Sequence, residues 1–133
     1  MRLLIHDARL VAPMDDARRR LPGGWVLIED DRIAGVGSGE PPAGPVDRRL
    51  DARGKVVLPG LVNTHHHLPQ TLTRNVPRVQ EAPLFRWLVE LYEVWRGTDA
   101  EAVEVAARVG LGELLLTGCT TSTDHLYLFP RGH

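Results

Sequence analysis

The sequence predicts an α/β protein in which an N-terminal β segment precedes a strand-helix-strand unit. Three observations lead to this prediction. Short apolar clusters separated by turn residues fill the first 58 positions, a proline-glycine pair follows at 59–60, and a helical pattern then lies between two strand-like stretches. The chain has 133 residues, of which 43% are hydrophobic, and this is enough for a hydrophobic core.

The first part of the chain carries strand signals only. Residues 2–12 contain apolar clusters, and residues 25–37 predict two short strands joined at Asp30 and Asp31, the pattern of a hairpin. A stretch rich in proline and glycine interrupts the pattern at 38–47, and residues 50–60 then predict another short strand with a turn around Gly54. We therefore expect residues 1–58 to be all-β.

The second part begins with a different pattern. Residues 61–67 predict a buried strand that ends in three histidines. Residues 68–97 form a long excursion in which apolar and aromatic side chains recur at helical spacing, which predicts one helix within it. The residues that define this spacing are Leu84, Trp87, Leu88, Leu91, Tyr92 and Trp95.

A clearer helix begins at 98. Thr98 and Glu101 have the spacing of a capping box, an apolar face follows, and Gly118 is placed to end the helix. Residues 120–128 then predict a second strand. A strand, a helix and a further strand make a βαβ unit with parallel strands, the repeating unit of a TIM-like (β/α)8 barrel. Such a barrel takes roughly 250 residues, so we expect this one to be incomplete.

Composition and charge exclude several classes of partner. Sixteen basic and seventeen acidic residues leave a formal net charge of -1, which provides no field to attract nucleic acid or an anionic membrane surface. No apolar run approaches the roughly 20 residues of a membrane span. The single cysteine, Cys119, excludes an internal disulfide and is best explained as a small buried hydrophobe. We expect a cytoplasmic protein.

The densest chemical signal is the histidine run that ends the first predicted strand of the second part. Side chains alternate along a strand, so His65 and His67 point the same way while His66 points away. Two imidazoles at one strand end can ligate zinc or iron and leave positions for further ligands and water. A fortuitous surface cluster is the plain alternative, but the position after a tight turn and a buried strand favours a metal site.

Several longer segments resemble a known family. DARGKVVLPGLVNTHHHLPQTLTR at 51–74 resembles the signature of the amidohydrolase superfamily, in its cytosine deaminase and chlorohydrolase group. WLVELYEVW at 87–95 and ELLLTGCTTSTDHLYLFP at 113–130 resemble, more narrowly, 8-oxoguanine deaminases and hydroxyatrazine ethylaminohydrolases. The resemblance implies part of a β-sandwich over 1–58, followed by the start of a truncated (β/α) barrel over 59–133.

The resemblance also implies an activity. It predicts a metal-dependent aminohydrolase that removes an amine from a cyclic amidine such as 8-oxoguanine or a hydroxytriazine, with one divalent metal ion, zinc or else iron, held by His65 and His67. The other metal ligands and the proton-shuttling residues would lie beyond the chain end, so the active site is partial and the fragment alone is expected to be inactive. Gln70, just after the histidines, is the predicted substrate contact, because an amide suits the edge of a heterocycle; an ordinary loop glutamine is the alternative. A homo-oligomer is possible in the full-length parent.

Other residues allow two interpretations. Trp87, Tyr92 and Trp95 are either an aromatic wall for a planar ring or, more simply, core. Asp124 and His125, at the end of the second predicted strand, are expected to border the pocket, with Asp124 either orienting a histidine ligand or capping a turn. The alternatives for the whole chain are another amidohydrolase with a cyclic-amide substrate and a non-catalytic metal-binding or assembly remnant.

Overall fold

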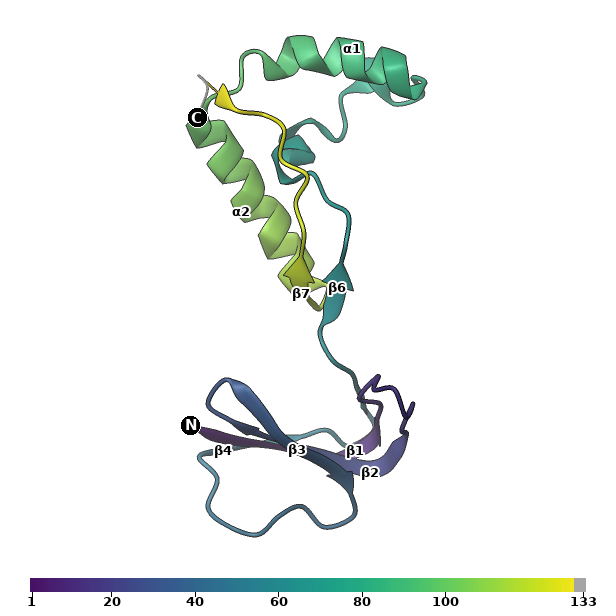
Figure 1. The fold of residues 1–133 in the computed structure, drawn as a ribbon, viewed down its shortest axis with the longest axis vertical. Coiled ribbons are helices and arrows are strands. Elements are labelled where there is room, and N and C mark those ends of the chain that lie inside the picture. The colour runs from purple at the N-terminus through teal and green to yellow at the C-terminus, as the bar shows by residue number, and fades with distance from the viewer. Residues whose placement is uncertain (131–133) are drawn as a thin grey trace. The chain divides into compact units, whose positions relative to one another are not determined.

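A computed structural model of the chain describes residues 1–130 (Figure 1). The last three residues of the predicted second domain, 131–133, lie outside the described residues. The chain divides into two compact units, Met1–Pro59 and a second that begins at Gly60, one residue from the boundary expected at 58/59. Among the described residues, no helix has both the length and the apolar character needed to cross a membrane.

The first unit is a five-stranded mixed sheet. Its central strand β1 (Arg2–Val11) pairs antiparallel with β2 (Leu21–Glu29), which pairs antiparallel with β3 (Arg32–Ser38). On its other edge β1 pairs in parallel with β4 (Arg48–Asp51) and then with β5 (Val56–Val57). The prediction of an all-β first part is confirmed.

Two turns of this unit form where the sequence places them. The β2–β3 hairpin turns at Asp30 and Asp31, and Asp30 has a φ of 54°, a left-handed conformation that Asp tolerates better than most residues. Gly54 has a φ of 75° between β4 and β5, where a side chain would be strained. The core cluster consists of Ala8 and Val11 of β1, Val26 of β2, and Ala52, which follows β4.

The second unit contains the predicted βαβ arrangement. Strands β6 (Leu61–Asn63) and β7 (Cys119–Ser122) are parallel, and helix α2 (Ala100–Leu116) lies between them in the chain (Figure 1). The excursion after β6 holds two 3₁₀ helices, η1 (Leu68–Thr73) and η2 (Pro77–Val79). Gly118, with a φ of 86°, follows α2 as predicted.

Helix α1 (Leu84–Trp95) confirms the helix predicted inside the excursion and supplies the buried core of the second unit. Leu91 and Trp95 are buried there, and the Trp95 ring lies edge-on to those of Trp87 and Tyr92. The Trp95 indole N–H donates to the hydroxyl of Thr73 at 3.0 Å. Trp95 is therefore a core residue, whereas Trp87 is half-buried and Tyr92 is 49% exposed.

Both strands of the second unit are shorter than the sequence pattern indicates. Strand pairing ends at Asn63 and Ser122, so the histidines and Asp124 lie in extended segments beyond the strands. The expectation of a buried strand is wrong for the described residues, because Leu61 is 56% and Val62 65% exposed. Each of these strands pairs only with the other among the described strands, and the side chains of Leu61 and Val62 remain uncovered, whereas Cys119 at the start of β7 is buried.

The predicted start of α2 is also wrong. The N-cap residue is Asp99, whose carboxylate accepts a hydrogen bond from the backbone N–H of Ala102 at 2.8 Å. The N–H of Thr98 instead donates to the carbonyl of Trp95, so Thr98 still belongs to the turn that ends α1. The capping box expected from Thr98 and Glu101 does not form, because Asp99 occupies the N-cap position.

Candidate metal centre

The histidine segment after β6 is held by main-chain hydrogen bonds to the segment after β7. The N–H of Thr123 donates to the carbonyl of Asn63 at 3.0 Å, and the N–H of His125 donates to the carbonyl of His66 at 2.7 Å. The side-chain oxygen of Asn63 also accepts from the N–H of His65 at 3.2 Å. These bonds fix the backbone on either side of the histidines, although none of the histidines lies in a strand.

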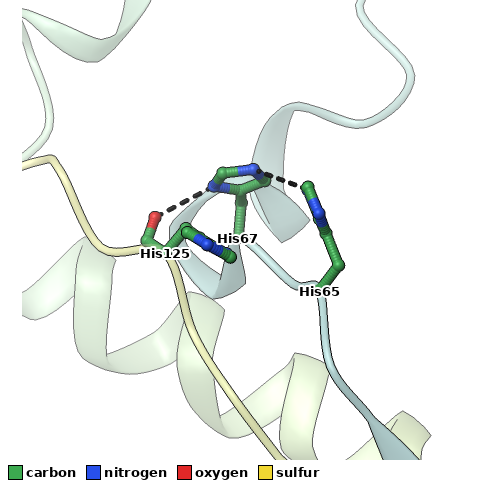
Figure 2. Close-up of side chains that lie close together, drawn as sticks. All are labelled: His65, His67 and His125. Carbon is green, nitrogen blue, oxygen red and sulfur yellow. Dashed lines mark hydrogen bonds between the residues drawn. The ribbon is translucent and has the colours of Figure 1, made fainter.

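The side chains of His65 and His67 converge as predicted (Figure 2). Their Nε2 atoms are 3.2 Å apart. The other ring nitrogen of His67, Nδ1, is 2.9 Å from the main-chain carbonyl of His125, which can only accept a hydrogen bond. Nδ1 of His67 therefore donates this hydrogen bond, which leaves Nε2 as the ring nitrogen that faces His65.

This pair of nitrogens suits a divalent transition metal. Zinc binds histidine nitrogen at roughly 2.0–2.1 Å in tetrahedral geometry, which requires two ligand atoms about 3.3 Å apart. The separation of 3.2 Å between His65 and His67 matches that value. The bond from His67 to a carbonyl is also the arrangement that orients metal-ligating histidines in proteins. The donor atoms present therefore fit a metal ion.

His66 lies away from this pair, as strand alternation predicts. A Cβ placed at Gly110 of α2 would be 3.7 Å from Cε1 of His66, so the ring packs toward the helix. Nearby, Arg74 donates two hydrogen bonds of 2.8 Å to the carboxylate of Glu113 and joins the end of η1 to α2. The hydrogen bond from Arg74 holds the pKa of Glu113 below its usual value.

Asp124 and His125 have roles that the sequence left open or missed. The carboxylate of Asp124 accepts from the N–H of Leu68 at 2.9 Å, so it caps the 3₁₀ turn that follows His67 and orients no histidine ring. His125 supplies the carbonyl that holds His67, and its own ring lies beside the pair (Figure 2). A ring nitrogen of each of the three histidines lies within 4.8 Å of the other two. Only the expectation that parallel strands end at one edge pointed to this proximity.

Gln70 lies in η1 and faces an aromatic side chain instead of the histidines. Its amide N–H donates to the hydroxyl of Tyr127, whose ring lies edge-on to that of His67 with centroids 5.3 Å apart. Burial raises the pKa of Tyr127 above its usual value. Tyr127 also lines an open cleft of about 500 Å³ together with Tyr92 and Trp95. The amide nitrogen of Gln70 is thus bonded to Tyr127, and its contact with substrate stays a prediction.

Comparison with known proteins places this site in a family context. The amidohydrolase family profile matches residues 56–129. The 8-oxoguanine deaminase of Pseudomonas aeruginosa is 54% identical over 110 residues, which make up 82% of this chain and 24% of that protein. Hydroxydechloroatrazine ethylaminohydrolase of Pseudomonas sp. strain ADP is 32% identical over 127 residues, covering 88% of this chain and 26% of that enzyme.

The fold comparison agrees with these relatives. A mutant of atrazine chlorohydrolase TrzN from Arthrobacter aurescens TC1, solved with zinc and atraton, matches 94% of this chain and 29% of its own with a TM-score of 0.88 and 32% identity. The chain thus spans about a quarter of the length of the proteins it matches. Since the profile match includes both converging histidines and more than half of the 133 residues, the chain belongs to the amidohydrolase family.

Proposed function

We propose that the full-length protein is a metal-dependent aminohydrolase that deaminates a cyclic amidine such as 8-oxoguanine or a hydroxytriazine. The observation that carries the proposal is the pair of Nε2 atoms on His65 and His67, 3.2 Å apart, with His67 oriented by a carbonyl. The substrate class is supported by the 54% identity to an 8-oxoguanine deaminase and the 32% identity to a hydroxydechloroatrazine ethylaminohydrolase.

Each residue of this chain has a limited part in that proposal. A bound divalent ion, zinc by preference because a neighbour was solved with zinc, would supply Lewis acidity and lower the pKa of a water molecule. His65 and His67 hold the ion, and the carbonyl of His125 keeps the proton of His67 on Nδ1. Gln70 hydrogen-bonds the heterocycle, with its amide steadied by Tyr127. We assign no proton-shuttling residue to this chain.

The proposal includes the architecture expected from the sequence. The β6–α2–β7 unit is then the first βαβ unit of a (β/α)8 barrel, and residues 1–58 are part of a β-sandwich. The parallel pairing of β6 with β7 supports the first assignment, and the mixed sheet around β1 supports the second. We also propose a cytoplasmic location for the full-length protein.

The test is deamination by the full-length protein. We expect release of ammonia or an alkylamine from 8-oxoguanine or a hydroxytriazine, and no hydrolysis of a cyclic amide. His65→Ala and His67→Ala should each abolish turnover and remove bound metal, while His66→Ala serves as the matched control and should retain both. Turnover of cyclic amides alone, or metal loss in the His66 variant with retention in either neighbour, would contradict the proposal.

Gln70 is tested separately. Replacing Gln70 with Ala should raise KM or lower kcat/KM by the value of one hydrogen bond, about 0.5–1.5 kcal/mol or roughly 2- to 13-fold, with the metal content unchanged. Unchanged kinetics on both purine and triazine substrates would show that Gln70 does not contact the ring.

A further inference from the structure

The hydroxyl of Tyr127 has no role in the proposal above beyond the hydrogen bond that it accepts from Gln70. Tyr127 follows β7 and Gln70 lies in η1, so this bond joins the segments that follow the two paired strands. The Tyr127 ring also lies edge-on to that of His67, with centroids 5.3 Å apart. The polar groups of Gln70 and Tyr127 therefore lie beside the candidate metal centre.

The ring of Tyr127 is held in place by aromatic packing. It lies edge-on to the buried ring of Trp95, with centroids 5.9 Å apart, and it packs against the core that contains Leu91 and Trp95. Tyr127 and Gln70 are themselves only half-buried, so a ligand can still reach them. Polar groups that are fixed before a ligand arrives lose little conformational freedom when they bind it, and this favours selective binding.

The bond between the two side chains leaves one donor and one acceptor for a ligand. Because the Gln70 amide N–H donates to the hydroxyl oxygen, the hydroxyl proton of Tyr127 is directed elsewhere, and Oε1 of Gln70 remains an acceptor. Neither of these two groups makes a further hydrogen bond within residues 1–130. Reversal of the amide would exchange the two roles and leave the same pair of one donor and one acceptor.

We propose that Tyr127 determines substrate specificity, and that its hydroxyl and the Gln70 amide together bind a ring edge on which an N–H lies next to a carbonyl. The O–H of Tyr127 donates to the carbonyl, and Oε1 of Gln70 accepts from the N–H. The oxo forms of 8-oxoguanine and of a hydroxytriazine both carry such an edge, which is bound without being hydrolysed. The inference rests on the proposed function, which places such a ring beside His65 and His67.

Equilibrium binding to the metal-loaded full-length protein tests this with two probes. A dimethyl-hydroxytriazine presents an N–H next to a carbonyl in its oxo form, whereas trimethyltriazine has neither group at a similar size. Neither probe carries an amine that could be removed. We expect Tyr127→Phe to reduce the preference for the hydroxytriazine by roughly 2- to 13-fold, the value of one neutral hydrogen bond, and Gln70→Ala to reduce it by a similar factor.

Tyr92→Phe is the matched control. The Tyr92 ring also lies edge-on to Trp95, but Tyr92 is 49% exposed and its hydroxyl is not bonded to Gln70. This variant should keep the preference of the parent, and the metal content should be the same in all three variants. If Tyr127→Phe weakens the binding of both probes equally, the hydroxyl has only a structural role. If it weakens the binding of neither probe, the hydroxyl does not contact the ring. Either result overturns the proposal.

This binding measurement is independent of turnover. Selection of the hydroxytriazine through Tyr127 in a protein that deaminates nothing would leave this inference standing and remove the proposed function. An active deaminase whose preference is unchanged by Tyr127→Phe would have the opposite consequence.

Discussion

The two units of the chain differ in how their strands are paired and buried. In the first unit β1 has partners on both edges, and Leu4 and Ala8 on it are 1% and 0% exposed. In the second unit β6 and β7 have only each other among the described strands, and Leu61 and Val62 are more than half exposed. The buried core of the second unit lies instead under α1. The central strand of the first unit is thus both paired and buried, whereas Leu61 and Val62 of β6 are paired and still exposed.

The histidines of the candidate site lie in the second unit. The first unit holds one histidine, His6, which pairs with Asp7 at 2.8 Å, whereas the second gathers three at one point. That gathering depends on main-chain hydrogen bonds between two extended segments and very little on apolar burial. Backbone polar groups thus organise the candidate site, while each unit has its buried core elsewhere.

Truncating one buried leucine in each unit is the strongest test of this separation. Leu4→Ala in β1 and Leu91→Ala in α1 each remove a side chain that is 1% or less exposed, and each should lower the free energy of unfolding of its own unit by about 2–5 kcal/mol. Residue-resolved amide hydrogen exchange measures the two effects separately. Equal loss of protection in both units from either substitution would break the comparison.

A glycine pair in α2 tests how tightly the second unit is packed beside the histidines. A Cβ at Gly110 would lie 2.8 Å from Cδ2 of Leu68 and 3.0 Å from the hydroxyl of Thr71, so Gly110→Ala should cost about 1–3 kcal/mol. Gly112, in the same helix, has no atom within 4 Å of that position. Gly112→Ala should therefore stabilise the unit by about 0.5–1 kcal/mol, since alanine favours the helix. Thermal unfolding measures the change in stability of both variants, which should have opposite signs. If both substitutions stabilise or both destabilise the unit, the packing around Gly110 is not as described.

The cap of α2 gives a smaller effect. Asp99→Ala should lower stability by about 0.5–2 kcal/mol because the N–H of Ala102 loses its acceptor. Thr98→Ala is the control and should change little, since the Thr98 side chain caps nothing in the described structure. Chemical denaturation midpoints measure both, and a larger loss from the Thr98 variant would restore the capping box that the sequence suggests.

Acid titration of the first unit is expected to give the smallest effect. A hydrogen bond from the Arg53 side chain, aided by the Arg53 N–H, lowers the pKa of Asp51 from 3.8 to about 2. A carboxylate with a depressed folded pKa contributes stability above the unfolded value, and this contribution is lost as the pH falls from about 4 through about 2. Arg53→Ala should raise the pKa of Asp51, measured by carboxyl ¹³C shifts, whereas the exposed Arg49→Ala should not. If the pKa of Asp51 is the same in the Arg53→Ala variant and the parent, Arg53 does not stabilise the Asp51 carboxylate.

Local signals were sufficient for part of this structure. The hairpin turn at Asp30 and Asp31 and the helix end at Gly118 follow from conformations that those residues favour, and both were predicted. The convergence of His65 and His67 followed from backbone alternation alone, and it persists although both residues lie beyond the strand.

Other features depend on partners that no local pattern reveals. The lengths and exposure of β6 and β7 depend on which strands flank them, so the expectation of buried strands was wrong. The choice of Asp99 over Thr98 as N-cap depends on where α1 releases the chain. The acceptor for His67 is a main-chain carbonyl, which every residue carries, so the sequence held no sign that His125 would supply it.

The bond from His67 to the carbonyl of His125 also sets an order of events during synthesis. The acceptor is added 58 residues after the donor. At about 5–20 residues per second, a ribosome needs roughly 3–12 s to make that stretch. During this interval a nascent chain contains His65 and His67 but no carbonyl to orient the second ring. This bond can therefore orient the His67 ring only after residue 125 has been translated.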